Sequence, residues 1–428
     1  MGPVPKSKKK LSGWANFPAI EADVFEPQDA AGVGYVVKHT SSIIARGNGK
    51  SYGDASLSPV VLSTLGLNRI LHFDPDKGLI TCEAGVLLAD ILPVILSAGW
   101  FFHVTPGIKS ITVGGAIASD VHGKNHPAKG CFSNWLISVE LMIGDGSIVL
   151  CSRDENPDLF WQTCGGMGWT GVIISATFQL MRIQSSVMRQ QTVHGANLEQ
   201  LFAAFEENND AGYAAAWIDT TAGLKNFGRG AVHFAEHDSA PSSLIWPETK
   251  TKNIRFFAPS WILNPLSIRA HNAIYFNKNK PGVKYVHMDD YFYPLDRITN
   301  WNRLYGRRGF VQYQFCIPEE KAFDGFKSVL EAIRKSADTP FLSVMKRHGE
   351  RPPEAIHSFP IKGYSLALDF PRTRTILSLV EILDDIVWQF DGKIYLTKDA
   401  CSNAKMGRVD PGSFGEPKFW SLLKGRIG

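Results

Sequence analysis

The sequence predicts an α+β fold with two domains. The chain has 428 residues, more than one hydrophobic core usually serves, and a hydrophobic content of 44% can fill two cores. Short strand-like runs punctuated by glycines fill residues 30–182, whereas longer helical patterns and aromatic-rich strands follow residue 184. We therefore expect a domain boundary near residue 184.

Strands and helices are both expected in the N-terminal part. Apolar runs predict strands at residues 36–37, 43–45, 79–83, 138–143, 147–151 and 171–181. Leucine and isoleucine recur at helical spacing over residues 87–98, which predicts a helix there. A short helix is expected over residues 156–164, because Pro157 suits a first helical turn and two glycines follow the segment. The glycines at 144 and 146 predict a hairpin turn.

The C-terminal part shows longer elements and one irregular segment. Helical patterns cover residues 329–333 and 375–390, and strand patterns cover residues 310–316 and 365–370. Residues 240–265 contain several prolines and read as a linker. The aromatic side chains of this linker suit either a lid over a pocket or an ordinary packed loop.

Composition excludes several classes of protein. A net charge of +4 is too small to indicate nucleic-acid binding. The one dense basic run, residues 6–10, is expected to be a frayed, solvated terminus, and contact with an anionic membrane surface is the less favoured alternative. The chain contains 6 cysteines without CxxC spacing, which argues against zinc or a disulfide scaffold. With neither a signal peptide nor an apolar stretch that spans a bilayer, we expect a cytoplasmic protein, soluble or peripheral to the inner membrane.

Two glycine-rich segments are the most informative part of the sequence. Residues 107–126 join a glycine-rich turn to a polar cluster, and residues 45–54 hold a second glycine loop. Such loops let backbone N–H groups converge on phosphate oxygens. Two of them suit a pyrophosphate-bearing cofactor better than a single phosphate. The G-x-G-x-x-x-G spacing of residues 47–53 is not a dinucleotide fingerprint, so a structural turn is an equal alternative for that loop alone.

Two histidines in the second of these segments invite a metal hypothesis. His122 and His126 are spaced i,i+4, but no carboxylate or cysteine stands at ligand spacing. We expect no metal. Hydrogen bonds from these loop histidines to cofactor or substrate fit the pattern better.

Amides and lysines mark a second group of candidates. Gln312 and Gln314 share one face of a predicted strand, and amides on a pocket-facing sheet suit sugar hydroxyls. A solvated strand face is an equal alternative. Lys346 and Lys398 each follow an apolar run that suits a buried strand, so each either reaches water or has a function.

A set of motifs in register carries a family resemblance. These are Leu11-Ser12-Gly13-Trp14, Arg46-Gly47-Asn48-Gly49-Lys50-Ser51-Tyr52-Gly53-Asp54, Thr112-Val113-Gly114-Gly115-Ala116-Ile117-Ala118, His122-Gly123-Lys124-Asn125-His126, Trp301-Asn302-Arg303 with Tyr305-Gly306, Gln312-Tyr313-Gln314-Phe315, and Tyr395 with Lys398-Asp399. Together they resemble the FAD-dependent sugar oxidases of the vanillyl-alcohol-oxidase type, most closely the decaprenylphosphoryl-β-D-ribose oxidase group. The match runs through most of the chain.

The resemblance implies a PCMH-type FAD-binding domain in two parts. Residues 1–184 would form its first part, residues 185–392 a substrate domain with an antiparallel sheet flanked by helices, and residues 393–428 a segment that returns to the FAD domain. Many related oxidases carry a flavin-tethering histidine at the position of Lys50, so FAD is expected to be noncovalent. The implied FAD-binding residues are Ala45, Arg46, Gly47, Asn48, Gly49, Lys50, Ser51, Tyr52, Gly53, Asp54, Ala55, Gly107, Thr112, Val113, Gly114, Gly115, Ser119, Asp120, Val121, His122, Ile173 and Tyr395.

The resemblance also implies a reaction. Hydride would pass from a secondary sugar hydroxyl carbon to flavin N5, giving a 2-keto sugar. In the closest group this is the first half of a ribose to arabinose epimerisation at C2 of a polyprenyl-phosphate-linked ribose, and a separate NAD(P)H-dependent keto-sugar reductase completes it. The catalytic candidates are Lys398 and His122. The implied substrate-binding residues are Tyr52, Trp217, Gln312, Gln314, Lys346, Ser365 and Tyr395.

Two departures and two alternatives accompany the resemblance. A pocket cysteine of some members aligns with Ala367 and an asparagine with Ser365, so this pocket should be less polar and resist thiol-directed inhibitors. After Asp399 the chain is shorter than expected.

The alternatives are a free-sugar or aldonolactone oxidase that uses oxygen, and a flavin-binding subunit without catalysis. The apolar residues 256–266 offer a channel for a lipid carrier.

Overall fold

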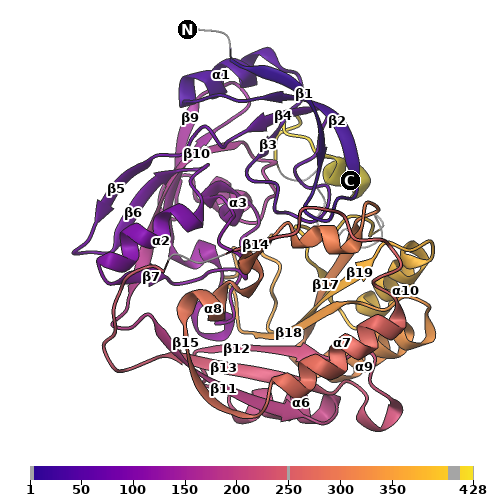
Figure 1. Ribbon diagram of the computed structural model, residues 1–428. Coiled ribbons are helices and arrows are strands. Elements are labelled where there is room, and N and C mark those ends of the chain that lie inside the picture. Colours follow the sequence, from indigo (N-terminus) through magenta and orange to yellow (C-terminus); the bar gives the residue numbers. More distant parts are fainter. Residues whose placement is uncertain (1–3, 248–250, 403–414, 428) are drawn as a thin grey trace.

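Helices and mainly antiparallel sheets are combined in this chain, which confirms the expected α+β class (Figure 1). The computed structural model describes residues 4–247, 251–402 and 415–427. Its framework consists of a 4-stranded, a 6-stranded and an 8-stranded sheet. A small parallel pair joins β14 (Lys252–Asn253) to β16 (Ile298–Thr299).

The 4-stranded sheet has the order β1-β2-β4-β3. Its strands are β1 (Lys6–Ser12), β2 (Ala19–Phe25), β3 (Ile44–Arg46) and β4 (Val60–Ser63). The prediction that residues 6–10 are frayed is wrong, because they belong to β1. Lys6 pairs with Asp23 on the neighbouring strand at 2.9 Å, and Lys9 pairs with Glu26 at 2.8 Å. Cross-strand ion pairs therefore hold a segment that has no apolar alternation.

The strand expected at residues 36–37 is also wrong. These residues lie in α1 (Ala30–His39), in which Val33, Val36 and Val37 recur at helical spacing and fill a core. Asp29 caps the helix by accepting a hydrogen bond from the Gly32 N–H at 2.7 Å. The helical period decides the structure here, and a valine pair alone does not indicate a strand.

The 6-stranded sheet has the order β5-β6-β10-β8-β9, with β7 also paired to β10. Its strands are β5 (Ile70–Asp74), β6 (Leu79–Glu83), β7 (Trp100–Phe102), β8 (Leu136–Met142), β9 (Ile148–Ser152) and β10 (Val172–Arg182). The helices around it are α2 (Leu88–Ser97), α3 (Val113–Ala118), α4 (His126–Lys129), η1 (Phe132–Trp135) and α5 (Pro157–Thr163). The helices expected at 87–98 and 156–164 correspond to α2 and α5.

The 8-stranded sheet is antiparallel, with the order β15-β11-β13-β12-β18-β19-β17-β20. Its strands are β11 (Val187–Gly195), β12 (Tyr213–Ile218), β13 (Gly230–His237), β15 (Gly282–His287), β17 (Phe310–Pro318), β18 (Leu342–His348), β19 (Gly363–Pro371) and β20 (Lys393–Ile394). One face packs against α6 (Leu198–Glu207), α9 (Glu319–Lys335) and α10 (Ile376–Gln389).

The packing of this face sets the direction of the remaining side chains. Val311, Tyr313 and Phe315 of β17 share the core with the three helices. Because successive strand residues point to opposite faces, Gln312 and Gln314 point away from that core. The same alternation applies to β19, where Leu366 and Leu368 lie in the core.

The remaining described elements connect the sheets. They are η2 (Leu224–Asn226), α7 (Pro265–Lys278), α8 (Met288–Phe292), η3 (Pro294–Arg297), η4 (Trp301–Tyr305) and α11 (Leu422–Ile427). Phe292 of α8 packs on Phe101 of β7 with ring centroids 5.1 Å apart, so the 6-stranded sheet and the substrate-side elements share one core. Among the described residues, no helix combines the length and the apolarity needed to cross a membrane.

The C-terminal helix returns to the first sheet. Leu423 and Ile427 of α11 pack in one core with Val24, Ile44 and Val61 of the 4-stranded sheet, and Figure 1 shows this end of the chain beside β2. The division into residues 1–184, 185–392 and 393–428 stays a proposal. In this division the third part begins with β20, which adds to the edge of the 8-stranded sheet.

Candidate functional site

A cavity of about 640 Å³ lies between the glycine-rich loops and the 8-stranded sheet. The glycine loops form one wall, and the polar face of the sheet forms the opposite wall. The lining also includes His271 of α7 and Lys284 of β15, which are both exposed. The cavity therefore reaches the surface beside α7 and β15.

The two glycine loops are joined to each other at this wall. The Asn48 side chain donates a hydrogen bond to the Ser110 carbonyl at 2.7 Å. A Cβ atom on Gly47 would overlap the Thr112 hydroxyl, so only glycine allows the loops to approach this closely. Within the described part of the chain, the backbone N–H groups of residues 48–51 donate to no protein acceptor. These free donors beside a cavity fit an anionic ligand such as the pyrophosphate of FAD.

Most of the FAD-binding residues expected from the resemblance line the cavity. They are Ala45, Gly47, Asn48, Gly49, Lys50, Ser51, Ala55, Gly107, Thr112, Gly114, Gly115, Ser119, Val121, His122, Ile173 and Tyr395. The residues present therefore fit the cofactor that the resemblance implies. The Tyr395 hydroxyl donates to the Ser119 carbonyl at 2.9 Å, which ties the C-terminal segment to the end of α3.

Six of the expected FAD-binding residues lie outside the lining, namely Arg46, Tyr52, Gly53, Asp54, Val113 and Asp120. Arg46 donates to the Ser12 carbonyl at 2.7 Å, and Val113 lies in a hydrophobic core. The Asp120 carboxylate accepts hydrogen bonds from the N–H and hydroxyl of Ser133, both at 2.9 Å. These side chains hold the loops in place and do not reach the cavity.

The polar face of the sheet supplies the opposite wall. Its cavity-lining side chains include Trp217, Gln312, Gln314, Lys346, Ser365 and Ala367. They alternate with core residues on β12, β17, β18 and β19, as the two-residue period requires. Lys346, expected at the end of a strand, lies inside β18. None of the six cysteines, all of which are described, lines this cavity.

Lys398 lies against an aromatic ring and is influenced by the charge of a buried carboxylate. Its Nζ lies 3.6 Å from the centre of the Tyr52 ring, so Tyr52, although expected to bind substrate, supports the lysine from behind the lining. Burial lowers the pKa of Lys398 to about 7, while Asp369 raises that pKa and Lys346 lowers it. Lys398 can therefore lose its proton near neutral pH.

Asp369 joins this lysine to the amide wall. Its carboxylate accepts a hydrogen bond from the Gln312 side-chain amide, and burial raises the pKa of Asp369. The other end of that amide, Oε1, is buried without a partner among the described residues. Gln312 can therefore accept a hydrogen bond from a ligand hydroxyl.

His122 is a neutral hydrogen-bonding group. Burial, followed by the charges of Lys346 and its neighbours, lowers the pKa of His122 well below its usual value. Its Nε2 lies 3.3 Å from the Gln314 amide nitrogen, which must be the donor, so the proton belongs on Nδ1. Within the described chain, Nδ1 has no partner and is available to a ligand. No group of three or more described His, Cys, Asp or Glu side chains could hold a metal ion.

Three residues that matter at this site were not among the candidates. Lys124 lines the cavity, and burial lowers its pKa to about 7. Asp369 follows Ser365 and Ala367 on the same face of β19, and His348 follows Lys346 on the same face of β18. The Ser365 hydroxyl lies 2.7 Å from His348 Nε2. The two-residue period could have identified Asp369 and His348 from the sequence.

The apolar residues 256–266 do not form the expected channel wall. None of them lines the cavity, and the side chains of Phe256, Trp261 and Leu266 are exposed. Leu244, Trp246, Ile254 and Leu263 of the expected linker pack against hydrophobic cores, so its described part agrees with the packed-loop alternative and not with a lid that lines the pocket.

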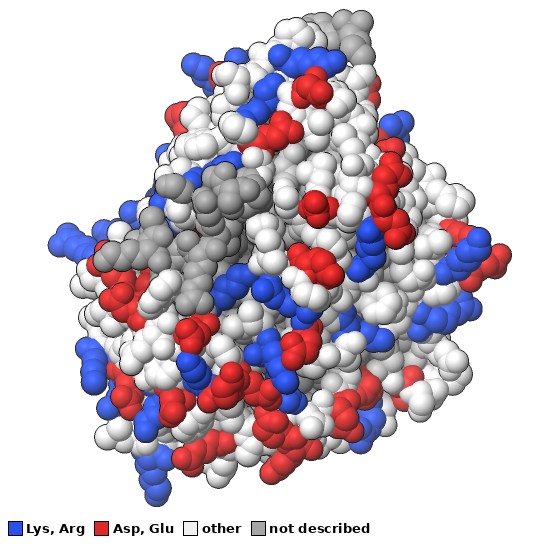
Figure 2. Space-filling view, turned by 180° about the vertical axis from the view of Figure 1, so that it is seen from behind, with Lys and Arg blue, Asp and Glu red and all other residues white. Residues whose placement is uncertain are grey.

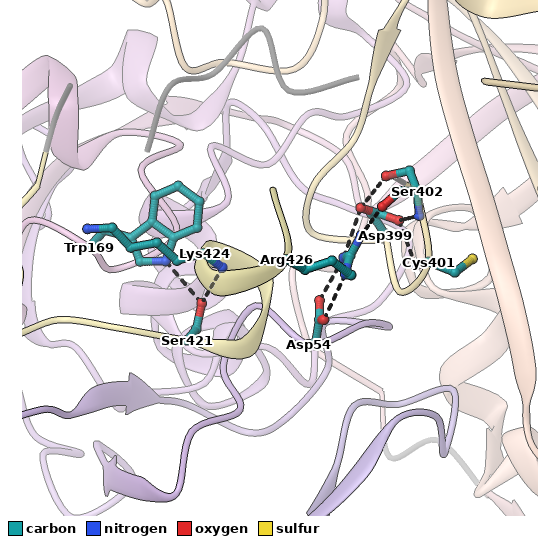
Figure 3. Close-up of polar contacts among 8 residues, drawn as sticks. All are labelled: Asp54, Trp169, Asp399, Cys401, Ser402, Ser421, Lys424 and Arg426. Atoms are coloured by element: carbon teal, nitrogen blue, oxygen red, sulfur yellow. Dashed lines mark hydrogen bonds and ion pairs between the residues drawn. The ribbon is translucent and has the colours of Figure 1, made fainter. Parts of the chain in front are cut away.

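Arg426 ties both sides of the site together (Figure 3). Its guanidinium binds both oxygens of Asp54, at 3.1 and 3.0 Å, and one oxygen of Asp399 at 3.0 Å. Asp54 ends the first glycine loop, and Asp399 follows Lys398 in sequence. The Asp399 carboxylate also accepts from the Cys401 and Ser402 N–H groups at 3.0 and 2.8 Å. One arginine of α11 therefore fixes the loop and the lysine relative to each other.

Replacing Arg426 should destabilise the fold in a pH-dependent way. Arg426→Gln leaves two buried carboxylates without a counter-charge, and we expect a loss of about 3–5 kcal/mol in the free energy of unfolding at pH 7. Burial already raises the pKa of Asp54, and losing the arginine raises it further. The folded variant then prefers the protonated carboxyl, so the loss should shrink as the pH falls towards 4. Urea unfolding at several pH values measures this.

Lys424→Gln is the matched control, because it removes one positive charge from the same helix. The Lys424 amine lies 5.7 Å from the centre of the Trp169 ring. Its effect should be below about 1 kcal/mol. A similar loss in both variants, or a loss for Arg426→Gln that does not change with pH, contradicts the role of the arginine.

Comparison with known proteins agrees with this site. Residues 24–152 match the family described as FAD binding domain. The chain is 32% identical over 420 residues to decaprenylphosphoryl-beta-D-ribose oxidase of Mycolicibacterium smegmatis, covering 94% of this chain and 91% of that protein. It is 32% identical over 136 residues to L-gulonolactone oxidase of Mus musculus, covering 31% and 30%. It is 24% identical over 242 residues to Delta(24)-sterol reductase of Homo sapiens, covering 55% and 43%.

The similarity to the mycobacterial oxidase extends over nearly the whole of both chains, whereas the other two similarities are partial. It confirms the family resemblance, the FAD cofactor and an enzyme in place of a flavin-binding subunit without catalysis. The chain is an FAD-dependent oxidoreductase that acts on CH–OH groups, and it belongs to the family of decaprenylphosphoryl-β-D-ribose oxidase.

Proposed function

We propose that this oxidase takes hydride from C2 of a polyprenyl-phosphate-linked ribose and gives the 2-keto sugar. This step is the first half of a ribose to arabinose epimerisation, and a separate NAD(P)H-dependent keto-sugar reductase completes it. The observation that carries the proposal is the wall formed by Gln312, Gln314 and Ser365 next to Lys398. A row of neutral polar groups beside one titratable amine suits a sugar with one reacting hydroxyl.

The charge of the cavity supports a phosphate-linked substrate. Lys50, Lys124, Lys284, Lys346 and Lys398 line it. Among the described lining residues Asp290 is the one acidic side chain, and it pairs with Arg297. A cavity with so many amines and so little opposing charge favours anions. FAD accounts for part of that charge. Lys346 lies on the wall formed by the sheet, and the Lys124 amine donates a hydrogen bond to the Tyr291 carbonyl of α8.

In the proposed reaction each residue has a separate task. Bound FAD supplies the acceptor for the hydride. Lys398, in its neutral form, accepts the hydroxyl proton on Nζ. Asp369, when ionised, raises the pKa of that amine and orients Gln312, whose free oxygen accepts a hydrogen bond from a neighbouring sugar hydroxyl. His122 donates from Nδ1.

FAD is proposed to be held without a covalent bond. The position that carries a tethering histidine in related oxidases is Lys50, whose amine lies 3.6 Å from the centre of the Trp14 ring. Acid precipitation of the yellow protein should therefore leave FAD in the supernatant. A pellet that stays yellow contradicts noncovalent binding.

The choice of substrate can be tested by flavin bleaching without oxygen. A short-chain polyprenyl-phosphate ribose should bleach the flavin at concentrations at which free ribose and an aldonolactone leave it oxidised, because only the first presents an anion to the lysines. Bleaching by the free sugar or the lactone at equal or lower concentration favours the alternative, a free-sugar or aldonolactone oxidase that uses oxygen.

The pH dependence of flavin reduction tests the role of Lys398. If the neutral amine accepts the proton, the single-turnover rate rises with pH through the pKa of Lys398. Asp369→Asn removes a charge that raises this pKa, so the rise of the rate with pH (the acidic limb of the profile) should move to lower pH. Lys346→Gln removes a charge that lowers it, so the limb should move to higher pH. Lys398→Ala should slow reduction by about 10²–10⁴-fold.

The exposed Lys327 on α9 offers a matched control, because Lys327→Gln removes one positive charge far from the cavity wall. Its pH profile should equal that of the wild type. Lys398 has no part in the chemistry if the acidic limb of the pH profile stays in place in both Asp369→Asn and Lys346→Gln. Near-normal flavin reduction in Lys398→Ala leads to the same conclusion.

The location of the protein is also a proposal. A lipid-phosphate carrier resides in a membrane, so an enzyme that acts on it works at the membrane surface. We place this oxidase in the cytoplasm, peripheral to the inner membrane.

A further inference from the structure

A contiguous part of the chain beside the cavity carries positive charge without opposing charge. Residues 251–288 contain no Asp or Glu, but they contain Lys252, Arg255, Arg269, Lys278, Lys280 and Lys284. None of these six forms an ion pair with another described residue. On the face seen from behind, by contrast, Lys and Arg are interspersed with Asp and Glu (Figure 2).

The same part of the chain exposes large apolar side chains. Phe256 is 82% exposed, Leu266 is 80% exposed, Trp261 is 72% exposed and Tyr285 is 61% exposed. Ile274 of α7 and Val283 of β15 are exposed as well. Soluble proteins seldom leave so many large apolar groups in water without a partner. We call residues 252–285 the basic aromatic surface.

Structural contacts make the basic aromatic surface continuous. Asn264 caps α7 with its side chain, which accepts from the Leu266 and Ser267 N–H groups, so the irregular segment leads directly into the helix. At the other end of α7, the Asn279 carbonyl lies 2.5 Å from His194 Nε2 on β11, the strand to which β15 pairs. In Figure 1, α7 lies on the near side of the molecule.

Further basic residues adjoin this surface from η4 and the loop after it. The guanidinium groups of Arg303 and Arg307 lie 5.6 and 5.7 Å from the centre of the Phe257 ring. Arg303 also donates to the Ile254 and Arg255 carbonyls at 3.1 and 2.8 Å, which holds the aromatic segment in place. The aromatic groups are thus displayed by a structured segment surrounded by cations.

The cavity opens within the same surface. His271 and Tyr275 of α7, Asn279 after it and Lys284 of β15 all line the cavity. A ligand that enters between α7 and β15 therefore passes residues of the basic aromatic surface before it meets the polar wall of the sheet.

We propose that the basic aromatic surface docks on a bilayer that contains anionic lipids. Exposed Trp, Phe and Leu side chains insert at the boundary between headgroups and acyl chains, and Lys and Arg bind the anionic headgroups. Charge complementarity excludes a neutral bilayer and a basic protein surface, and the exposed Phe256, Trp261 and Leu266 side chains favour a lipid boundary over an acidic protein surface. The inference rests on the proposed function in one respect, because docking there places the cavity mouth against the membrane that holds a lipid-linked substrate.

Vesicle sedimentation with the full-length, FAD-loaded protein tests the proposal. Vesicles of phosphatidylcholine with phosphatidylglycerol should sediment the protein, whereas vesicles of phosphatidylcholine alone should leave it in solution. Raising the salt concentration should weaken binding, because the headgroup attraction is screened. The double charge reversal Arg255→Glu with Arg269→Glu should weaken binding by at least roughly tenfold. Phe256→Ser with Trp261→Ser should weaken it as well.

The matched control reverses the same number of charges elsewhere. Lys327→Glu with Lys335→Glu changes two exposed lysines of α9 and should leave vesicle binding unchanged. Equal weakening by both charge reversals, equal binding to neutral vesicles, or no binding to anionic vesicles overturns the proposal. In the last case a protein partner becomes the occupant to consider.

Failure of the docking surface can be separated from failure of the proposed function. Bleaching of the flavin by a water-soluble short-chain substrate should occur at the wild-type rate in all these variants, because none of the six altered residues lines the cavity. Vesicle binding without any bleaching contradicts the proposed substrate and leaves the surface standing. Bleaching without vesicle binding supports the proposed substrate and contradicts the docking surface.

Discussion

The two-residue period of the 8-stranded sheet is the constraint on which the site depends. Three helices cover one face of the sheet, so every second residue of β17 and β19 is held in a core. The residues between them point to the opposite face of the sheet, which forms the cavity wall. A shift of one residue in β17 would bury Gln312 and Gln314 under α9 and α10 and send Tyr313 into the cavity. The polar wall is therefore positioned by core packing on the far side of the sheet.

In the proposed reaction, burial lets similar side chains take different tasks. Removal from water lowers the pKa of Lys124, Lys346 and Lys398, so each can be neutral or charged near neutral pH. A lysine that touches a phosphate is held in its charged form by that anion. A lysine that faces a reacting hydroxyl has to be neutral. Position relative to the substrate separates the two roles, and Arg426 fixes the position of Lys398 through Asp399.

Much of this arrangement could be predicted from local sequence patterns. The contacts between residues distant in sequence could not be predicted. Helical spacing identified α2, and strand period placed Gln312 and Gln314 on one face. The valines of α1 were misassigned because a two-residue run has no period, and β1 was missed because ion pairs with β2 replace apolar alternation. Arg426 binds Asp54 across 372 residues of sequence, and no local signal announces such a pair. The exposure of Phe256, Trp261 and Leu266 likewise depends on the elements around them.

The central claim is that hydride leaves C2 of the sugar. The most direct measurement is single-turnover flavin reduction with a polyprenyl-phosphate ribose analogue that carries deuterium at C2, compared with the unlabelled analogue and with one labelled at C3. Our account predicts slower bleaching with the C2 label alone and a 2-keto product. Equal rates with and without the C2 label, together with slowing by the C3 label, would show that another carbon is oxidised.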